Sequence, residues 1–98
     1  MPLEDYYSGN EAFKNFASVA DQELDAQIVS WDGWSALVAA CQGDALLARA
    51  LLRVIGVGAA EWLESRPAVL DGLTGAECMT APRGQARLRE ALMRFPCA

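Results

Sequence analysis

Residues 43–56 read Gly-Asp-Ala-Leu-Leu-Ala-Arg-Ala-Leu-Leu-Arg-Val-Ile-Gly, and this stretch carries the clearest structural signal in the chain. Gly43 favours the left-handed conformation that ends a helix, and Asp44 favours the capping position that begins the next one. Four apolar side chains then share one face: Leu47, Leu51, Val54 and Ile55. Arg49 and Arg53 lie roughly opposite that face, so we expect both to be solvated. The stretch predicts an amphipathic helix.

Helical spacing also precedes this stretch. Apolar residues recur at three- and four-residue steps between Phe13 and Ile28, and acidic residues lie off that stripe. This pattern predicts one amphipathic helix, or two with a joint near Asp21. Ser8 or Asn10 is the expected cap at its start.

Two turn or break signals, at residues 30–33 and at Pro67, divide the chain between residues 30 and 67. Residues 30–33, Ser-Trp-Asp-Gly, predict a turn, because the aspartate offers a side-chain acceptor and Gly33 can adopt a positive φ. A second helix is expected over residues 34–42. A short one is expected over residues 59–65, ended by Pro67.

The last third predicts two further helices. Thr74-Gly75-Ala76-Glu77 fits a capping box, and residues 82–84, Pro-Arg-Gly, are interpreted as a break. A final helix is expected from about Gln85 to Phe95. Its inner face is Leu88, Ala91, Leu92 and Phe95, and its solvated flank is Arg83, Arg87, Glu90 and Arg94. With no alternation of period two, the sequence predicts an all-α, compact bundle of about five to six short helices.

Length and charge restrict the class of protein. A chain of 98 residues is expected to form a single helical domain, with residues 1–44 as an N-terminal part of unknown role. Residues 1–25 carry six acidic residues against Lys14 alone, whereas residues 67–98 carry four arginines against three acids. A duplex-binding face needs more concentrated positive charge, and no helix-turn-helix is recognised, so we expect no nucleic-acid partner.

Cysteine usage and hydropathy indicate a cytoplasmic protein. The three cysteines, Cys41, Cys78 and Cys97, form no Cys-x-x-Cys pair, and the chain has no histidine, so no metal site is expected. Cys41 and Cys78 are expected to be reduced, small core residues. The N-terminus is acidic where a signal peptide is basic, and charged residues interrupt the most apolar stretch, so we expect no membrane association.

The residues that usually perform catalysis are scarce. Without histidine, neither a Ser/His/Asp nor a Cys/His arrangement can form. Lys14 is the single lysine and lies among acids, where nothing would depress its pKa. No phosphate-binding glycine motif is present, so no cofactor is expected. The sequence predicts a protein-binding module rather than an enzyme.

The second half of the chain resembles a known family. After Ile55-Gly56 come Ala60-x-Trp62-Leu63, Leu70-x-Gly72-x-Thr74, Glu77 and Gly84-x-x-x-Leu88-x-x-x-Leu92. This order over about residues 45–95 resembles the toxin-binding domain of the Xre/MbcA/ParS antitoxin family. The resemblance implies an antitoxin-like inhibitor from a bacterial toxin–antitoxin system, with residues 45–98 as the toxin-binding part. Its protein partner would be a RES-domain toxin, an NAD-consuming enzyme, whose active-site entrance it covers.

The resemblance places the contact on the final helix and tail. The implied partner-binding residues are Arg83, Arg87, Arg94, Phe95 and Pro96. Gly75 stands where the family usually has proline, and residues 1–44 lack the DNA-binding helices of the family's longer members. The sequence leaves open whether copies of the chain form a homo-oligomer.

An alternative interpretation uses the other end of the chain. Glu4, Asp5, Tyr6 and Tyr7 form an acidic, aromatic stretch that could dock a basic protein surface. The chain would then be a small acidic inhibitor or adaptor, of the kind found in phage or defence loci. Deleting residues 1–9 separates the two interpretations, because only the alternative predicts loss of binding.

Overall fold

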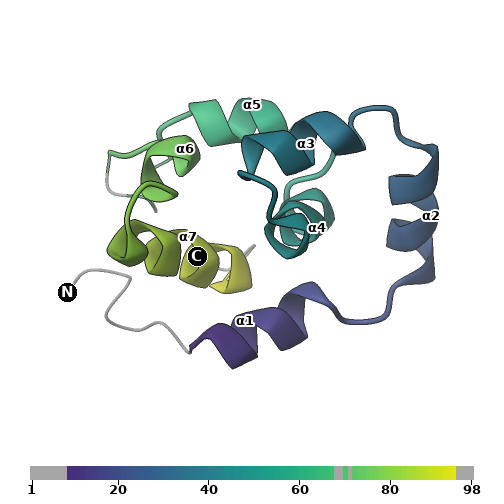
Figure 1. Cartoon of the computed structure of the whole chain (residues 1–98), viewed down its shortest axis with the longest axis horizontal. Helices are drawn as coiled ribbons and strands as arrows, with labels where there is room; N and C mark the ends of the chain where they lie inside the picture. The colour runs from purple at the N-terminus through teal and green to yellow at the C-terminus, as the bar shows by residue number, and fades with distance from the viewer. Residues whose placement is uncertain (1–8, 68–69, 71, 95–98) are drawn as a thin grey trace.

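The computed structural model describes residues 9–67, 70 and 72–94, and these residues form seven α-helices without any strand (Figure 1). The helices are α1 (Asn10–Ala17), α2 (Gln22–Ser30), α3 (Trp34–Ala40), α4 (Ala45–Val54), α5 (Ala59–Glu64), α6 (Gly75–Cys78) and α7 (Pro82–Arg94). The predicted all-α bundle is confirmed. The number rises to seven because the first apolar segment divides into α1 and α2.

Helix α4 lies at the centre of the core. It packs against α1, α3 and α7, and Ala48, Ala50 and Leu51 on it are completely buried. Small alanine side chains let neighbouring helices approach its backbone closely. The stretch that indicated the fold most clearly in the sequence is therefore the one around which the other helices assemble.

Arg49 on α4 corrects the expectation of a solvated side chain. Only 14% of it is exposed. Its Nε donates to the carbonyl of Ala17 at 2.9 Å, its Nη2 to the carbonyl of Val19 at 2.7 Å, and its Nη1 to Asp25 at 2.6 Å. The carbonyls at the end of α1 have no partner within their own helix, so a guanidinium placed there satisfies them.

Arg53, one turn further along α4, has a related role although it is exposed. Its Nη1 donates to the carbonyl of Phe16 at 2.6 Å, and its guanidinium lies 4.7 Å from the centroid of the Phe16 ring. Both arginines were expected to face only solvent. They instead hold the end of α1 against α4 and so join the two halves of the chain.

The joint between the first two helices lies where one of the two sequence alternatives placed it. Asp21 caps α2 by accepting a hydrogen bond from the amide of Leu24 at 3.0 Å. At the start of α1 the expected cap is wrong, because Gly9 takes that position without a side-chain bond and Asn10 lies inside the helix. Ser8 lies outside the described residues.

Gly33 precedes α3, as the predicted turn requires, but its φ of −79° is not the positive value expected. A Cβ atom there would overlap the indole ring of Trp31, so the glycine provides space rather than a left-handed conformation. Helix α3 then ends at Ala40, two residues earlier than expected. Gln42 and Gly43 adopt φ values of 58° and 86°, and the amide of Gly43 donates back to the carbonyl of Val38. This is a Schellman ending.

The last two helices, α6 and α7, meet at a close backbone approach. The predicted capping box of Thr74 and Glu77 is present at the start of α6. A Cβ atom at Gly84 would overlap the carbonyl oxygen of Cys78, so α6 and α7 can only meet this closely at a glycine. Helix α7 begins at Pro82, three residues before the expected start. The proline residue interpreted as a break occupies the first helical turn, where its missing N–H costs nothing.

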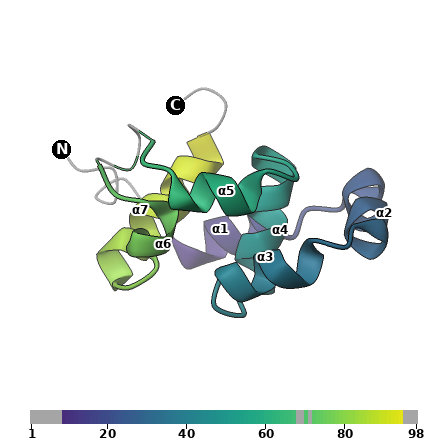
Figure 2. The same ribbon diagram turned by 90° about the horizontal axis from the view of Figure 1, so that it is seen from above.

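The molecule is elongated, with extents of 40 × 25 × 23 Å, and α2 lies at one end of it in both views (Figures 1 and 2). Among the described residues, no single helix is both long and apolar enough to cross a membrane. Helices α3 and α4 meet that test only as a pair, and they are bent by 115° at the break between them.

Candidate partner-binding site

The three arginines expected to contact a partner share one side of α7. Arg83, Arg87 and Arg94 fall within about 40° of one another around the helix axis and span roughly 16 Å along it. We call these three residues the arginine stripe. Leu88 and Leu92, on nearly the opposite side, are completely or almost completely buried, which fixes the rotation of α7. The stripe side of α7 also carries Glu90, which is buried, so Arg83 and Arg94 are the exposed members of the stripe.

Arg87 and Arg94 in the stripe bond to groups within the described residues. Arg87 donates through Nη1 to the carbonyl of Leu70 at 3.3 Å, and Arg94 donates through Nε to Glu90 at 2.6 Å. Glu90 was expected on a solvated flank, but it is only 5% exposed, and its carboxylate forms an ion pair with Arg94. Arg83 is exposed at the start of the helix.

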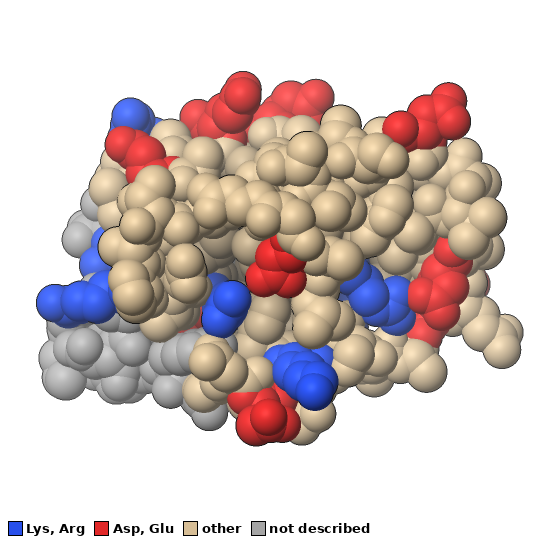
Figure 3. Space-filling model, viewed as in Figure 1, with Lys and Arg blue, Asp and Glu red and all other residues tan. Residues whose placement is uncertain are grey.

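Acidic side chains are spread over the face seen in Figure 3. They line the edge over α5 and α3, and others lie beside the basic side chains of α1 and α4. The whole chain carries a net charge of −5. The stripe, with three arginines and Glu90, is thus a positive strip on a negatively charged protein, and it can attract an anionic surface or pocket.

The remaining predicted partner-binding residues lie outside the described part of the chain. These are Phe95 and Pro96 after the stripe, and Glu4, Asp5, Tyr6 and Tyr7 at the N-terminus.

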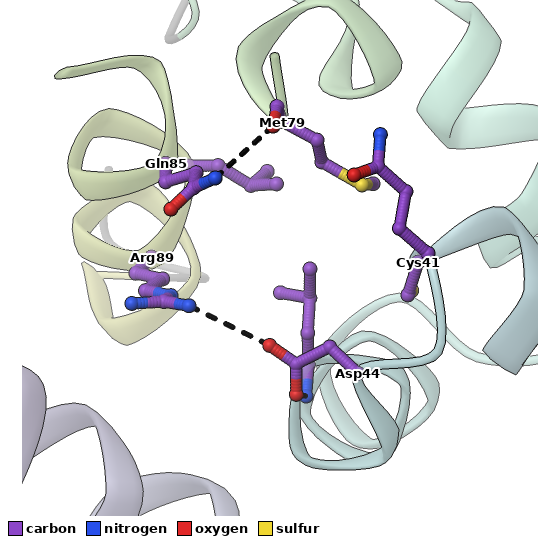
Figure 4. Close-up of a pocket in the computed structure, with 8 residues that line it drawn as sticks. Cys41, Asp44, Met79, Gln85 and Arg89 are labelled. Carbon is purple, nitrogen blue, oxygen red and sulfur yellow. Dashed lines mark hydrogen bonds and ion pairs between the residues drawn. The ribbon is translucent and has the colours of Figure 1, made fainter. Parts of the chain in front are cut away.

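The structure brings together a second set of residues that the sequence did not suggest as a site. A cavity of about 140 Å³, here called the Arg89 cleft, lies between α7, the loop before α4 and the loop after α6 (Figure 4). The residues lining it include Cys41, Gln42, Asp44, Met79, Gln85 and Arg89. Asp44 was predicted as a helix cap and is one, since its Oδ1 accepts from the amide of Leu47 at 3.1 Å. Its Oδ2 also faces Arg89.

The two cysteines within the described residues are core residues. Cys41 and Cys78 are both buried, as expected, and neither is in a disulfide. Burial, together with the nearby carboxylate of Asp44, raises the pKa of the Cys41 thiol to about 12. Cys41 is therefore a neutral thiol at neutral pH, whereas a reactive cysteine needs a lowered pKa.

Glu77 is occupied structurally rather than available for proton transfer. The backbone N–H of Thr74 donates to its carboxylate at 2.9 Å, and Arg66 lies 2.7 Å from the same oxygen. The hydrogen bond from the Thr74 backbone, and then the charge of Arg66, lower the pKa of Glu77 below its ordinary value. A carboxylate held ionised in this way caps a helix well and is a poor general acid. The described residues also contain no cluster of three or more potential metal ligands.

Comparison with known proteins adds no relative. The chain matches no protein-family model, no curated protein and no solved structure.

Proposed function

We propose that this chain is a protein-binding module that neutralises a RES-type, NAD-consuming toxin by covering its active-site entrance with α7. The observation that carries the proposal is the arginine stripe, a positive strip on an otherwise acidic protein. The motif resemblance over residues 45–95 supplies the class of partner.

The chemistry of the stripe suits such a partner. A pocket that binds a dinucleotide is shaped for phosphate groups, and a guanidinium offers paired donors that match phosphate or carboxylate oxygens. Arg83 is exposed at the start of α7, and 44% of the Arg94 side chain is exposed at its end. Inhibition in this arrangement is steric and needs no reaction by the chain itself. The buried face of α7 keeps the stripe in place, which lowers the entropy lost on binding.

Co-expression with a RES-domain enzyme encoded beside this chain tests the proposal. The intact chain should restore growth and co-purify with the enzyme. Arg83→Glu combined with Arg87→Glu should weaken binding about tenfold or more, because each substitution replaces an attraction with a repulsion. Arg83→Glu alone is also compared with Lys14→Glu on α1, which makes the same single charge reversal on an exposed residue away from the stripe.

The outcomes separate the two docking interpretations. If the intact, folded chain neither binds the enzyme nor relieves its toxicity, the proposed function is wrong. Deleting residues 1–8 keeps Gly9, whose carbonyl accepts the first hydrogen bond of α1. Loss of binding in that variant, with the stripe variant unaffected, favours docking through Glu4, Asp5, Tyr6 and Tyr7.

A further inference from the structure

Arg89 is a cation largely withdrawn from solvent. It reaches from the middle of α7 toward α1 and the start of α4, and only 22% of its side chain is exposed. Its Nη1 donates to Asn10 at 3.0 Å, and the guanidinium lies 5.4 Å from the centroid of the Phe13 ring. These contacts hold one end of the guanidinium in place.

The other edge of this guanidinium is incompletely bonded. Its Nε is buried and has no hydrogen-bond partner, and its Nη2 lies 3.5 Å from Asp44, at the outer limit of a hydrogen bond. Arg49 provides an internal comparison, because all three of its nitrogens have partners at 2.6–2.9 Å. A buried donor without an acceptor costs about 1–3 kcal/mol. Arg89 therefore retains the capacity to bind an acceptor.

The Arg89 cleft lies beside this guanidinium, and because Nε itself is covered, a ligand reaches it only by displacing a neighbouring group. The cleft's volume of about 140 Å³ exceeds the roughly 30 Å³ that one water occupies in the liquid. Cys41 and Met79 contribute sulfur atoms to its lining, and Gln42 at its edge holds a left-handed conformation that glycine normally adopts. Backbone strain of this kind is often found beside functional sites.

The charges around the cleft limit an anionic ligand to one negative charge. Arg89 and Asp44 are the charged residues among those that line it, and Cys41 contributes a neutral thiol. Because Asp44 faces the same edge of Arg89, a doubly charged phosphate would be repelled more strongly than a carboxylate. We propose that the Arg89 cleft binds a small monocarboxylate, whose oxygens accept hydrogen bonds from the parallel Nε–H and Nη2–H of Arg89.

A carboxylate in this position would loosen the long contact between Arg89 and Asp44 and satisfy the buried Nε. The Oδ1 atom of Asp44 would still cap α4 through the amide of Leu47. The Arg89 cleft is distinct from the arginine stripe. The test of ligand binding in the cleft therefore does not depend on the proposed toxin partner.

Nuclear magnetic resonance on the whole ¹⁵N-labelled chain at mildly acidic pH tests this inference. Sodium acetate is titrated against sodium chloride and sodium sulfate at matched ionic strength, and the Nε–H signal of Arg89 is followed. Sulfate replaces phosphate because it keeps two negative charges at this pH. Acetate should shift the signal saturably in the millimolar range, and sulfate should bind more weakly. Asp44→Asn retains a good helix cap but removes the competing charge, so acetate should bind about threefold to tenfold more tightly.

Arg89→Lys retains the positive charge but lacks the two-donor edge, so saturable shifts of the Gln42 and Gln85 amides should disappear. The inference is wrong if chloride shifts the Arg89 signal as acetate does, if acetate gives no saturation, or if Asp44→Asn does not strengthen binding. Retained acetate binding in Arg89→Lys would contradict it as well. If Arg89→Lys fails to fold, the acetate affinities of the wild type and Asp44→Asn decide whether the inference holds.

Discussion

Gln42 is the one non-glycine residue with a positive φ in the described part of the chain, and it illustrates how a single residue can oppose the local geometry. It occupies the position after α3 where a Schellman ending usually places glycine. The sequence suggested that Gly43 alone would turn the chain. The structure shows that both residues do so, because the bond from Gly43 back to Val38 requires Gln42 to turn first.

Replacing Gln42 with glycine should therefore stabilise the protein. A left-handed conformation costs a residue with a Cβ atom about 1–2 kcal/mol, and glycine avoids that cost. We expect Gln42→Gly to raise the free energy of unfolding by about 1 kcal/mol, seen as a higher urea midpoint with an unchanged slope. Gln42→Ala keeps the Cβ atom and should change stability by less than about 0.5 kcal/mol. Equal effects of the two variants would contradict this account.

Glu77 gives the stability a dependence on acidic pH. Its pKa is lower in the folded protein than its ordinary value of 4.5, first because the Thr74 backbone donates to it. The stabilisation is thus complete above the unfolded pKa and is lost as the pH falls through the folded pKa. Glu77→Gln can keep the capping hydrogen bond but does not titrate. Urea unfolding between pH 6 and pH 3 should show a smaller loss of stability in this variant than in the wild type; parallel curves would refute the assignment.

At the scale of helices, the features that the sequence predicted are those set by near neighbours. The caps at Asp44 and Thr74 were predicted because each involves residues three positions apart. The role of Arg49 was missed, since its partner carbonyl on Ala17 lies thirty-two residues earlier. The shared side of the arginine stripe follows from helical period alone. The Arg89 cleft does not, because Arg89 and Asp44 come together only through the packing of α7 beside α4.

The contact between α6 and α7 depends on Gly84. Alanine in a helix is normally about 1 kcal/mol more favourable than glycine, but its Cβ atom would here lie 2.9 Å from the Cα of Cys78. We expect Gly84→Ala to destabilise the protein by about 2 kcal/mol or more, because backbone atoms cannot move aside as a side chain can. Gly58→Ala, where the nearest atom is 3.9 Å away, should cost less than about 1 kcal/mol. Thermal or urea unfolding measures the loss of stability in each variant. Similar losses in Gly84→Ala and Gly58→Ala would show that the close approach at Gly84 does not determine the stability.

At the scale of the whole molecule, the two halves of the chain form one core. The buried cluster includes Phe13, Ala17, Leu24 and Leu37 from the first half together with the apolar residues of α4 and α7. Polar contacts also connect the first half of the chain to the second. Arg49 and Arg53 bind α1 and the segment after it, and Arg89 binds Asn10. The sequence pattern over residues 45–95 could not reveal this dependence, because its apolar positions look complete within their own helices.

A chain consisting of residues 45–98 alone should therefore fail to fold cooperatively. It would expose the faces of α4 and α7 that α1 and α3 cover. A domain this small has a low free energy of unfolding, so it cannot offset that exposure. Circular dichroism should show reduced helicity and a broad thermal transition, whereas the full chain melts sharply. Mixing residues 1–44 with residues 45–98 should restore part of the helicity, which unrelated peptides of similar charge should not do. A sharp transition of the isolated fragment near that of the full chain would show that the second half is an independent domain. Because we expect the opposite, the proposed partner should bind the stripe only when residues 9–44 hold α7 in place.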